Sequence, residues 1–163
     1  MTFTQRLKHC LTGVTVTMLL AVSCSANCQT TLPLASDLAL DAIESGRTGA
    51  PLIVMFSLPG CPHCEVVRRS HLLPLLRDQT ALPRPIVRQI DITSALSLRD
   101  FDGSKITHAE FAARQKIKLA PVVMFFGRSG EMLAKPLVGS MIPDFYGAYL
   151  DAALTEARTK LVP

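Results

Sequence analysis

The pattern of apolar positions along the chain predicts three strands. Leu52–Phe56 and Val122–Phe126 are each five consecutive apolar residues. Runs of this length without polar alternation are typical of strands that are buried on both faces of a sheet. A further run, Ile86–Ile90, predicts another strand, which ends at Asp91.

Helical segments are expected around the first of these strands. We expect a helix over Asp37–Ser45, capped by Ser36 and ended by Gly46. A second helix should begin near Pro62, and Pro74 should kink or break it. Strand, helix and strand in this order predict a right-handed βαβ unit.

The second half of the chain predicts a helix, a hairpin and a final helix. Residues 93–106 are polar, and we expect a loop there. The capping-box pattern Thr107-His108-Ala109-Glu110 should start a helix that runs to about Lys116. The strand at 122–126 should form a hairpin with Met132–Val138, and Pro143 should start the last helix. The expected apolar face of that helix consists of Tyr146, Leu150, Ala153, Leu154 and Ala157.

The first 26 residues have the character of a secretory signal peptide. Two basic residues precede the moderately apolar stretch Leu11–Val22, and small residues then lead to Ala26, after which we expect cleavage. A second interpretation is a lipoprotein signal, because Ala21-Val22-Ser23-Cys24 resembles a bacterial lipoprotein box whose cysteine is acylated. An uncleaved anchor is a third. Each of them predicts a periplasmic or otherwise exported domain, lipid-anchored at Cys24 in the second case.

The expected organisation is a leader (1–26), a short polar linker (27–34) and one domain (35–163). Lys and Arg number 17 against 13 Asp and Glu, so the formal charge is +4. Without the leader, which holds two of the basic residues, the counts are 15 and 13 and the charge is +2. With 48% apolar and 18% charged residues, intrinsic disorder is excluded. The remaining basic residues are scattered, so we expect no nucleic-acid partner, and membrane contact only through the leader or a lipid anchor.

The cysteines are unevenly placed. Cys10, Cys24 and Cys28 lie in or beside the leader, and only Cys61 and Cys64 lie in the domain. A disulfide-stapled scaffold would spread its cysteines through the domain. One close pair in an exported chain indicates redox chemistry instead, while the sequence gives Cys28 no role.

Cys61-Pro62-His63-Cys64 lies where a strand and a turn lead into a helix. At a helix N-terminus the peptide dipoles favour the Cys61 thiolate, which is the form that attacks disulfides. Cys64 lies one helical turn later, where it can resolve a mixed disulfide. A protonated His63 between the sulfurs would stabilise the thiolate further, the alternative being a solvated loop residue.

The pair has three other interpretations: a metal site, a haem attachment site and a structural disulfide. A zinc or copper site needs more ligands, and the chain offers only scattered ones: His63, His71, His108, Cys28 and Met55. Haem attachment needs His after the second cysteine, where Glu65 stands. A purely structural disulfide in so small a ring adds little stability. We therefore expect a redox-active pair and no cofactor.

The neighbouring polar residues are expected to be solvated. Arg68 and Arg69 would add positive potential near the thiolate, but an exposed helix face is the preferred interpretation. His71 and His108 are expected at the surface.

In its order of elements the chain resembles the thioredoxin-like superfamily, from about Ser36 to Lys160. The resemblance implies an α/β fold with a central mixed sheet of about four strands, βαβ then ββα, flanked by helices. Within that superfamily, the chain is similar to exported thioredoxin-related thiol:disulfide oxidoreductases with a Cys-Pro-His-Cys motif. The resemblance implies a cis Ala120–Pro121 bond facing the dithiol, with Ala120 offering backbone hydrogen bonds to a client strand.

Two positions depart from the cytosolic thioredoxins. Gly60 stands where those proteins have Trp before the first cysteine, and Met55 stands where they keep a buried carboxylate. Water or Glu65 would then have to accept the proton of the resolving cysteine.

The direction of electron flow stays open at this stage. Pro62-His63 is the dipeptide of DsbA-type oxidants, but the 56 residues between Cys64 and Pro121 leave no room for the helical insertion of that family. We favour a reductase that acts on client proteins with cysteines or disulfides and is supplied by a membrane redox partner. A DsbA-like oxidant and a copper-binding thioredoxin-like module are the alternatives.

Overall fold

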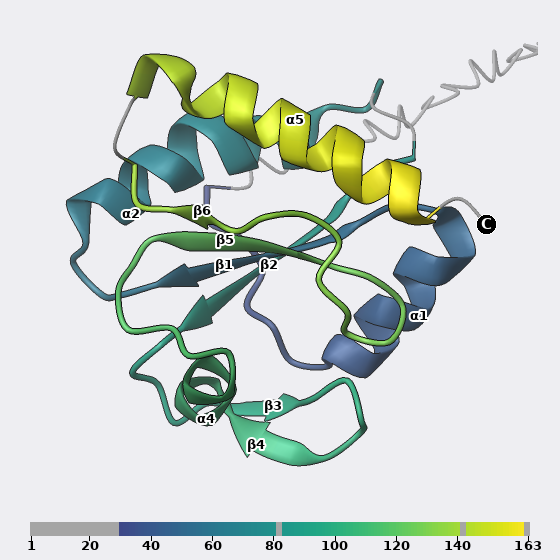
Figure 1. Ribbon diagram of the computed structural model, residues 1–163. Helices are drawn as coiled ribbons and strands as arrows, with labels where there is room; N and C mark the ends of the chain where they lie inside the picture. Colours follow the sequence, from purple (N-terminus) through teal and green to yellow (C-terminus); the bar gives the residue numbers. More distant parts are fainter. Residues whose placement is uncertain (1–29, 81–82, 141–142, 162–163) are drawn as a thin grey trace, which may run out of the picture.

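The computed structural model describes residues 30–80, 83–140 and 143–161 (Figure 1). The expected signal peptide, cleavage after Ala26, lipidation at Cys24 and any role of Cys28 lie outside the described residues.

The described chain contains both helices and strands. The helices are α1 (Leu38–Thr48), α2 (Pro62–Val67), a π-helical turn (Arg68–Leu72), α3 (Leu73–Arg77), α4 (His108–Arg114) and α5 (Pro143–Leu161). The strands are β1 (Leu52–Ser57), β2 (Ile86–Asp91), β3 (Ser97–Arg99), β4 (Lys105–Thr107), β5 (Val122–Phe126) and β6 (Leu137–Val138). None of the described helices is long and apolar enough to cross a membrane.

The main sheet has four strands in the order β2-β1-β5-β6. β1 pairs with β2 in parallel and with β5 antiparallel, and β6 pairs antiparallel with β5. The expected mixed sheet, βαβ followed by ββα, is therefore confirmed.

Two apolar cores lie on the two faces of this sheet. Figure 1 shows the helices that cover these faces. Successive residues of a strand point to opposite faces. Ile53 and Met55 accordingly pack under α2 and α5, while Val54 and Phe56 pack against the face covered by α1 and α4. All five residues expected on the apolar face of the last helix are buried.

Helix α1 is shifted along the chain from its expected position. Asp37, not Ser36, is the N-cap, and its carboxylate accepts a hydrogen bond from the Leu40 N–H at 2.9 Å. The helix continues through Gly46 and ends at Gly49, whose φ of 71° is the left-handed conformation that favours glycine. Both expected caps, Ser36 and Gly46, were therefore wrong: Asp37, an equally good N-cap residue, starts the helix, and Gly49 ends it.

The helix changes its geometry in the turn that precedes Pro74. A proline in a helix lacks the N–H of an i→i−4 bond. Here the preceding turn widens to π geometry, and the Leu73 N–H bonds the Arg68 carbonyl five residues back. Helical structure then continues to Arg77, so the predicted disturbance is a π-helical turn rather than a break.

The polar segment 93–106 is not simply a loop, as was expected. β3 and β4 form a separate two-stranded antiparallel sheet, with Leu98 opposite Ile106. Leu98 is fully buried in the core beneath α1 and α4. The hairpin closes the lower end of that core (Figure 1).

The end of the segment expected to be a linker packs against the domain. Leu32 is only 4% exposed. The Gln89 N–H bonds the Pro33 carbonyl at 2.8 Å, and the Ala35 N–H bonds the Gln89 carbonyl at 2.9 Å. Residues 33–35 thus line the outer edge of β2.

Strand β6 is shorter than the expected Met132–Val138. Only Leu137 and Val138 form the strand, and Met132 makes an isolated bridge with Phe126. The backbone between them leaves the ladder, and it places Leu133 and Ala134 in the core instead. β6 is therefore a short edge strand.

Candidate active site

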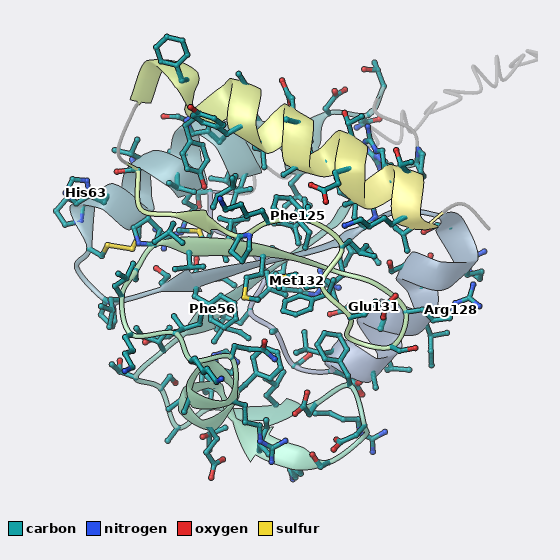
Figure 2. The ribbon with its side chains drawn as sticks, viewed as in Figure 1. Phe56, His63, Phe125, Arg128, Glu131 and Met132 are labelled. Atoms are coloured by element: carbon teal, nitrogen blue, oxygen red, sulfur yellow. A yellow bond between two sulfur atoms is a disulfide. The ribbon has the colours of Figure 1, made fainter. Side chains whose placement is uncertain are left out.

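The candidate active site lies where β1 gives way to α2. Cys61 is the N-cap of α2, and it forms a disulfide with Cys64, the Cα atoms being 5.2 Å apart. Cys64 is fully buried, while Cys61 is partly exposed. Figure 2 shows the disulfide near His63 at one end of the sheet. Only the first sulfur of the pair is open to a partner.

A main-chain donor points at the accessible sulfur. The Cys64 N–H lies 3.1 Å from Cys61 Sγ and donates to it. A sulfur in the N-cap position accepts this bond as a Ser or Asp oxygen would. The same donor stabilises negative charge on Cys61 once the disulfide is reduced.

His63 connects the motif to the loop after β6. Its side chain is exposed, and Nδ1 lies 2.9 Å from the Ser140 hydroxyl oxygen. A hydroxyl can donate to a neutral ring nitrogen or accept from a protonated one, so this contact is compatible with both charge states of His63.

Ala120 and Pro121 precede β5, and Pro121 contacts the loop after β6 that His63 also contacts. The peptide bond between them is cis. The Pro121 carbonyl accepts a hydrogen bond from the Gly139 N–H at 2.8 Å. Gly139 comes directly before Ser140, the residue that contacts His63. Ala120 and Cys61 both pack at the margin of the core that contains Cys64. The structure therefore brings the motif and the cis-proline together.

Met55 stands at the position where cytosolic thioredoxins keep a buried carboxylate. It is fully buried, in the same core as Cys64. Glu65 does not take the place of that carboxylate, because its side chain is 49% exposed and forms ion pairs with Arg68 and, at 3.0 Å, with Arg69. Desolvation raises the pKa of Glu65, but hydrogen bonds and charge from both arginines outweigh it and hold the pKa below its ordinary value. Glu65 is thus a weak proton acceptor.

Arg68 was expected on a solvated helix face, and this was wrong. It is 9% exposed, donates from Nε to Gln89 Oε1 at 2.8 Å, and donates from Nη2 to Ser57 Oγ at 3.1 Å. The i+4 spacing from buried Cys64 was the sequence signal that could have placed it on the inner face. Arg69, by contrast, is exposed as expected.

Neither His71 nor His108 lies freely at the surface. His71 is half-buried against the Tyr146 ring, with the ring centres 4.7 Å apart, and desolvation lowers its pKa in spite of the opposing charge of Asp151. His108 is 1% exposed. Its Nε2 contacts the Ala35 carbonyl at 2.7 Å, while Nδ1 accepts the Asp91 N–H at 3.3 Å.

His108 lies on the sheet face opposite Cys64, so we assign it a role in holding the fold. The expectation of a surface position was wrong because its two partners come from distant segments. Within residues 30–80, 83–140 and 143–161, no three His, Cys, Asp or Glu side chains gather as a metal site would require.

Comparison with known proteins supports the fold. No family model and no curated protein matches the sequence. Among solved structures, a thioredoxin from Fasciola hepatica is similar, with 16% identity, 77% of this chain and 99% of that chain covered, and a TM-score of 0.51. A designed protein is similar at 15% identity, with 75% and 96% covered and a TM-score of 0.50.

The chain has the thioredoxin-like fold, as its sequence predicted. Within that fold, the Cys61–Cys64 pair starts the helix that follows the central strand β1.

Proposed function

We propose that this protein is an exported thiol:disulfide oxidoreductase that reduces disulfides of client proteins through Cys61 and Cys64. The observation that carries the proposal is the asymmetry of the pair. An accessible Cys61 sulfur, held by the Cys64 N–H, is bonded to a fully buried Cys64. Such a pair attacks with one sulfur and resolves with the other.

The cycle starts from the reduced pair. Cys61 thiolate attacks a client disulfide, forming a mixed disulfide and releasing one client thiolate, which takes up a proton. Cys64 loses its proton and attacks Cys61 Sγ, which breaks the mixed disulfide and releases the second client thiol. Two electrons pass to the client, and the Cys61–Cys64 disulfide of the present structure is the oxidised product.

The proton of Cys64 needs an acceptor. Met55 offers none, and Glu65 is held ionised by two arginines at a lowered pKa. We infer that water or the departing client thiolate takes this proton. The resolving step should therefore respond weakly to loss of any single carboxylate.

The opposite direction is the second candidate. The Cys64 N–H and the Pro62-His63 dipeptide both favour a thiolate at Cys61, and thiolate stabilisation favours the reduced protein, which makes it an oxidant. The reduction potential decides between the two. A value near −270 mV, about that of thioredoxin, supports the reductase; one near −120 mV, about that of DsbA, replaces it with the oxidant.

Trapping tests the exchange itself. Cys64→Ser should accumulate mixed disulfides with client proteins, which non-reducing gels followed by mass spectrometry would detect. The matched variant Cys61→Ser should accumulate few, since it lacks the accessible sulfur. If neither variant traps a client and the wild-type protein does not exchange with oxidised glutathione, the proposal is wrong.

Export rests on the composition of the first 26 residues. Fractionation of cells making the full chain should recover it outside the cytoplasm. Cys24→Ser separates the two processing routes, because it abolishes membrane attachment only if Cys24 is acylated. Recovery of the wild-type protein in the cytoplasm would contradict the export proposal.

A further inference from the structure

The edge strand β6 has a groove on each side. One groove, of about 450 Å³, lies between β6 and α5 and is lined by Leu137, Tyr149 and Lys135 among others. The other, of about 510 Å³, lies towards the end of α4, and its lining includes Val122, Met132 and Lys118. Pro136 and Val138 line both. The two grooves therefore flank one strand on opposite faces of the sheet.

The backbone of Val138 faces away from the sheet. Gly139 bonds Pro121 through its N–H, and Leu137 lies opposite Val123. In an antiparallel pair every second residue directs its N–H and C=O at the partner strand, so Val138, between these two, directs its own outward. Its side chain is 53% exposed. An open strand edge of this kind pairs readily with another extended segment.

The charge around the grooves is predominantly positive. Arg114, Lys116, Lys118 and Lys135 line them against a single acid, Glu156. Arg114 is paired with Asp100, and Glu156 with Lys160. Among the described residues the three lysines form no salt bridge.

Exposed apolar side chains line the same grooves. Leu119 is 49% exposed, Met132 52% and Tyr149 55%. The surface combines an open strand edge, apolar grooves on both faces and three unpaired amines, which together suit an extended, apolar and acidic segment.

We propose that β6 is a docking edge for an extended segment of a partner protein in which apolar and acidic residues alternate. The segment pairs with Val138 as a fifth strand. Its successive side chains then enter the two grooves in turn, because neighbouring residues of a strand point to opposite faces. Acidic side chains meet Lys116 and Lys118 on one face, while apolar ones pack on Leu137 and Tyr149 on the other. This docking is independent of the sulfur chemistry.

Peptide binding tests the proposal on the oxidised full-length protein. The probe is a fluorescein-labelled, cysteine-free octapeptide of alternating glutamate and valine, and the control peptide has lysine in place of glutamate. Fluorescence anisotropy should show at least tenfold tighter binding of the acidic peptide. The Val138 amide should also exchange its hydrogen at least tenfold more slowly when the peptide is bound.

Two kinds of variant separate the contributions. Lys116→Glu with Lys118→Glu should weaken acidic-peptide binding at least tenfold, whereas Lys105→Glu on β4 should change it less than twofold. Val138→Pro should abolish binding, because proline has no N–H to offer, whereas Val138→Thr should retain it. A folded Lys116/Lys118 variant keeps the test valid should Val138→Pro fail to fold.

Equal binding of the two peptides, or unchanged Val138 exchange, would overturn the proposal. So would sedimentation showing that β6 is covered by a second copy of the chain. Oxidation of the reduced Cys61 and Cys64 thiols by oxidised glutathione, which is itself reduced to two glutathione thiols, needs no docking edge and should be unchanged in the Lys116/Lys118 variant. Failure of that reaction in the wild type would contradict the proposed function and leave the docking proposal standing.

Discussion

The main-chain N–H of Cys64 donates a hydrogen bond to Sγ of Cys61 at 3.1 Å. In the proposed cycle, the residue that resolves the mixed disulfide therefore also stabilises the sulfur that forms it. Because the donor belongs to the backbone, replacing the Cys64 side chain by Ser leaves the bond in place. This is why Cys64→Ser is suited to trapping.

His63→Ala should make the protein more reducing. Loss of the ring removes a positive charge that stabilises the Cys61 thiolate when His63 is protonated, and so destabilises the reduced form. We expect the dithiol–disulfide equilibrium to shift about tenfold towards the disulfide, about 30 mV in potential, measured against glutathione buffers. Arg69→Ala is the control, because that exposed cation should change the potential much less. An unchanged potential in His63→Ala would show that the ring has no such role.

Glu65→Gln should lower stability in a pH-dependent way. The pKa of Glu65 is held below its ordinary value in the folded protein, so its contribution is present above the unfolded-state pKa and is lost as pH falls through the folded one. We expect a loss under about 1 kcal/mol at pH 7, since the side chain is half exposed. Urea unfolding at pH 7 and pH 3 measures it, and the two proteins should converge at pH 3. A difference that grows on acidification would contradict the assignment.

His108→Phe should be strongly destabilising. The Ala35 carbonyl and the Asp91 N–H would lose their side-chain partner in a buried setting, at a cost of roughly 2–4 kcal/mol in free energy of unfolding. His71→Phe is the control, and it should cost less than about 1 kcal/mol because that ring is half-buried and its stacking on Tyr146 is retained. Equal denaturation midpoints for His108→Phe and wild type would disprove the structural role.

Tyr146→Phe should leave the protein equally stable or more stable. The Tyr146 hydroxyl is buried and has no hydrogen-bond partner among the described residues, and burial raises its pKa. Removing an unpaired buried hydroxyl should add up to about 1 kcal/mol to the free energy of unfolding. Thermal and urea unfolding would measure the change. A clear loss of stability would mean that the hydroxyl has a partner.

Much of the fold could be predicted because its strongest signals are local. The apolar runs of β1 and β5, the capping box at Thr107 and the spacing of α5 each identify an element within a few residues. The β3–β4 hairpin gives no such signal. Each of its strands has three residues, and its burial depends on Leu98 reaching a core built by α1 and α4.

The site was predicted where its chemistry is contiguous in the sequence. Cys61 and Cys64 are separated by three positions in the sequence, and the structure joins them in a disulfide. His108 was missed because both of its partners, Ala35 and Asp91, are remote in the sequence. Arg68 was missed because two adjacent arginines on a helix suggest a solvated face, whereas its contacts with Ser57 and Gln89 hold it inside. Ser140, 77 positions from His63, could not have been linked to the motif from spacing alone.

Residues 33–35 have a consequence for self-association. They occupy the backbone of β2 at Gln89, so among the described strands β6 is left as the open end of the main sheet. A sheet that can be extended from one end can pair once and then has no free end left to recruit another copy. Two molecules joined through β6 would stop at a closed pair, because the far end of each main sheet is already bonded at Gln89 by its own chain.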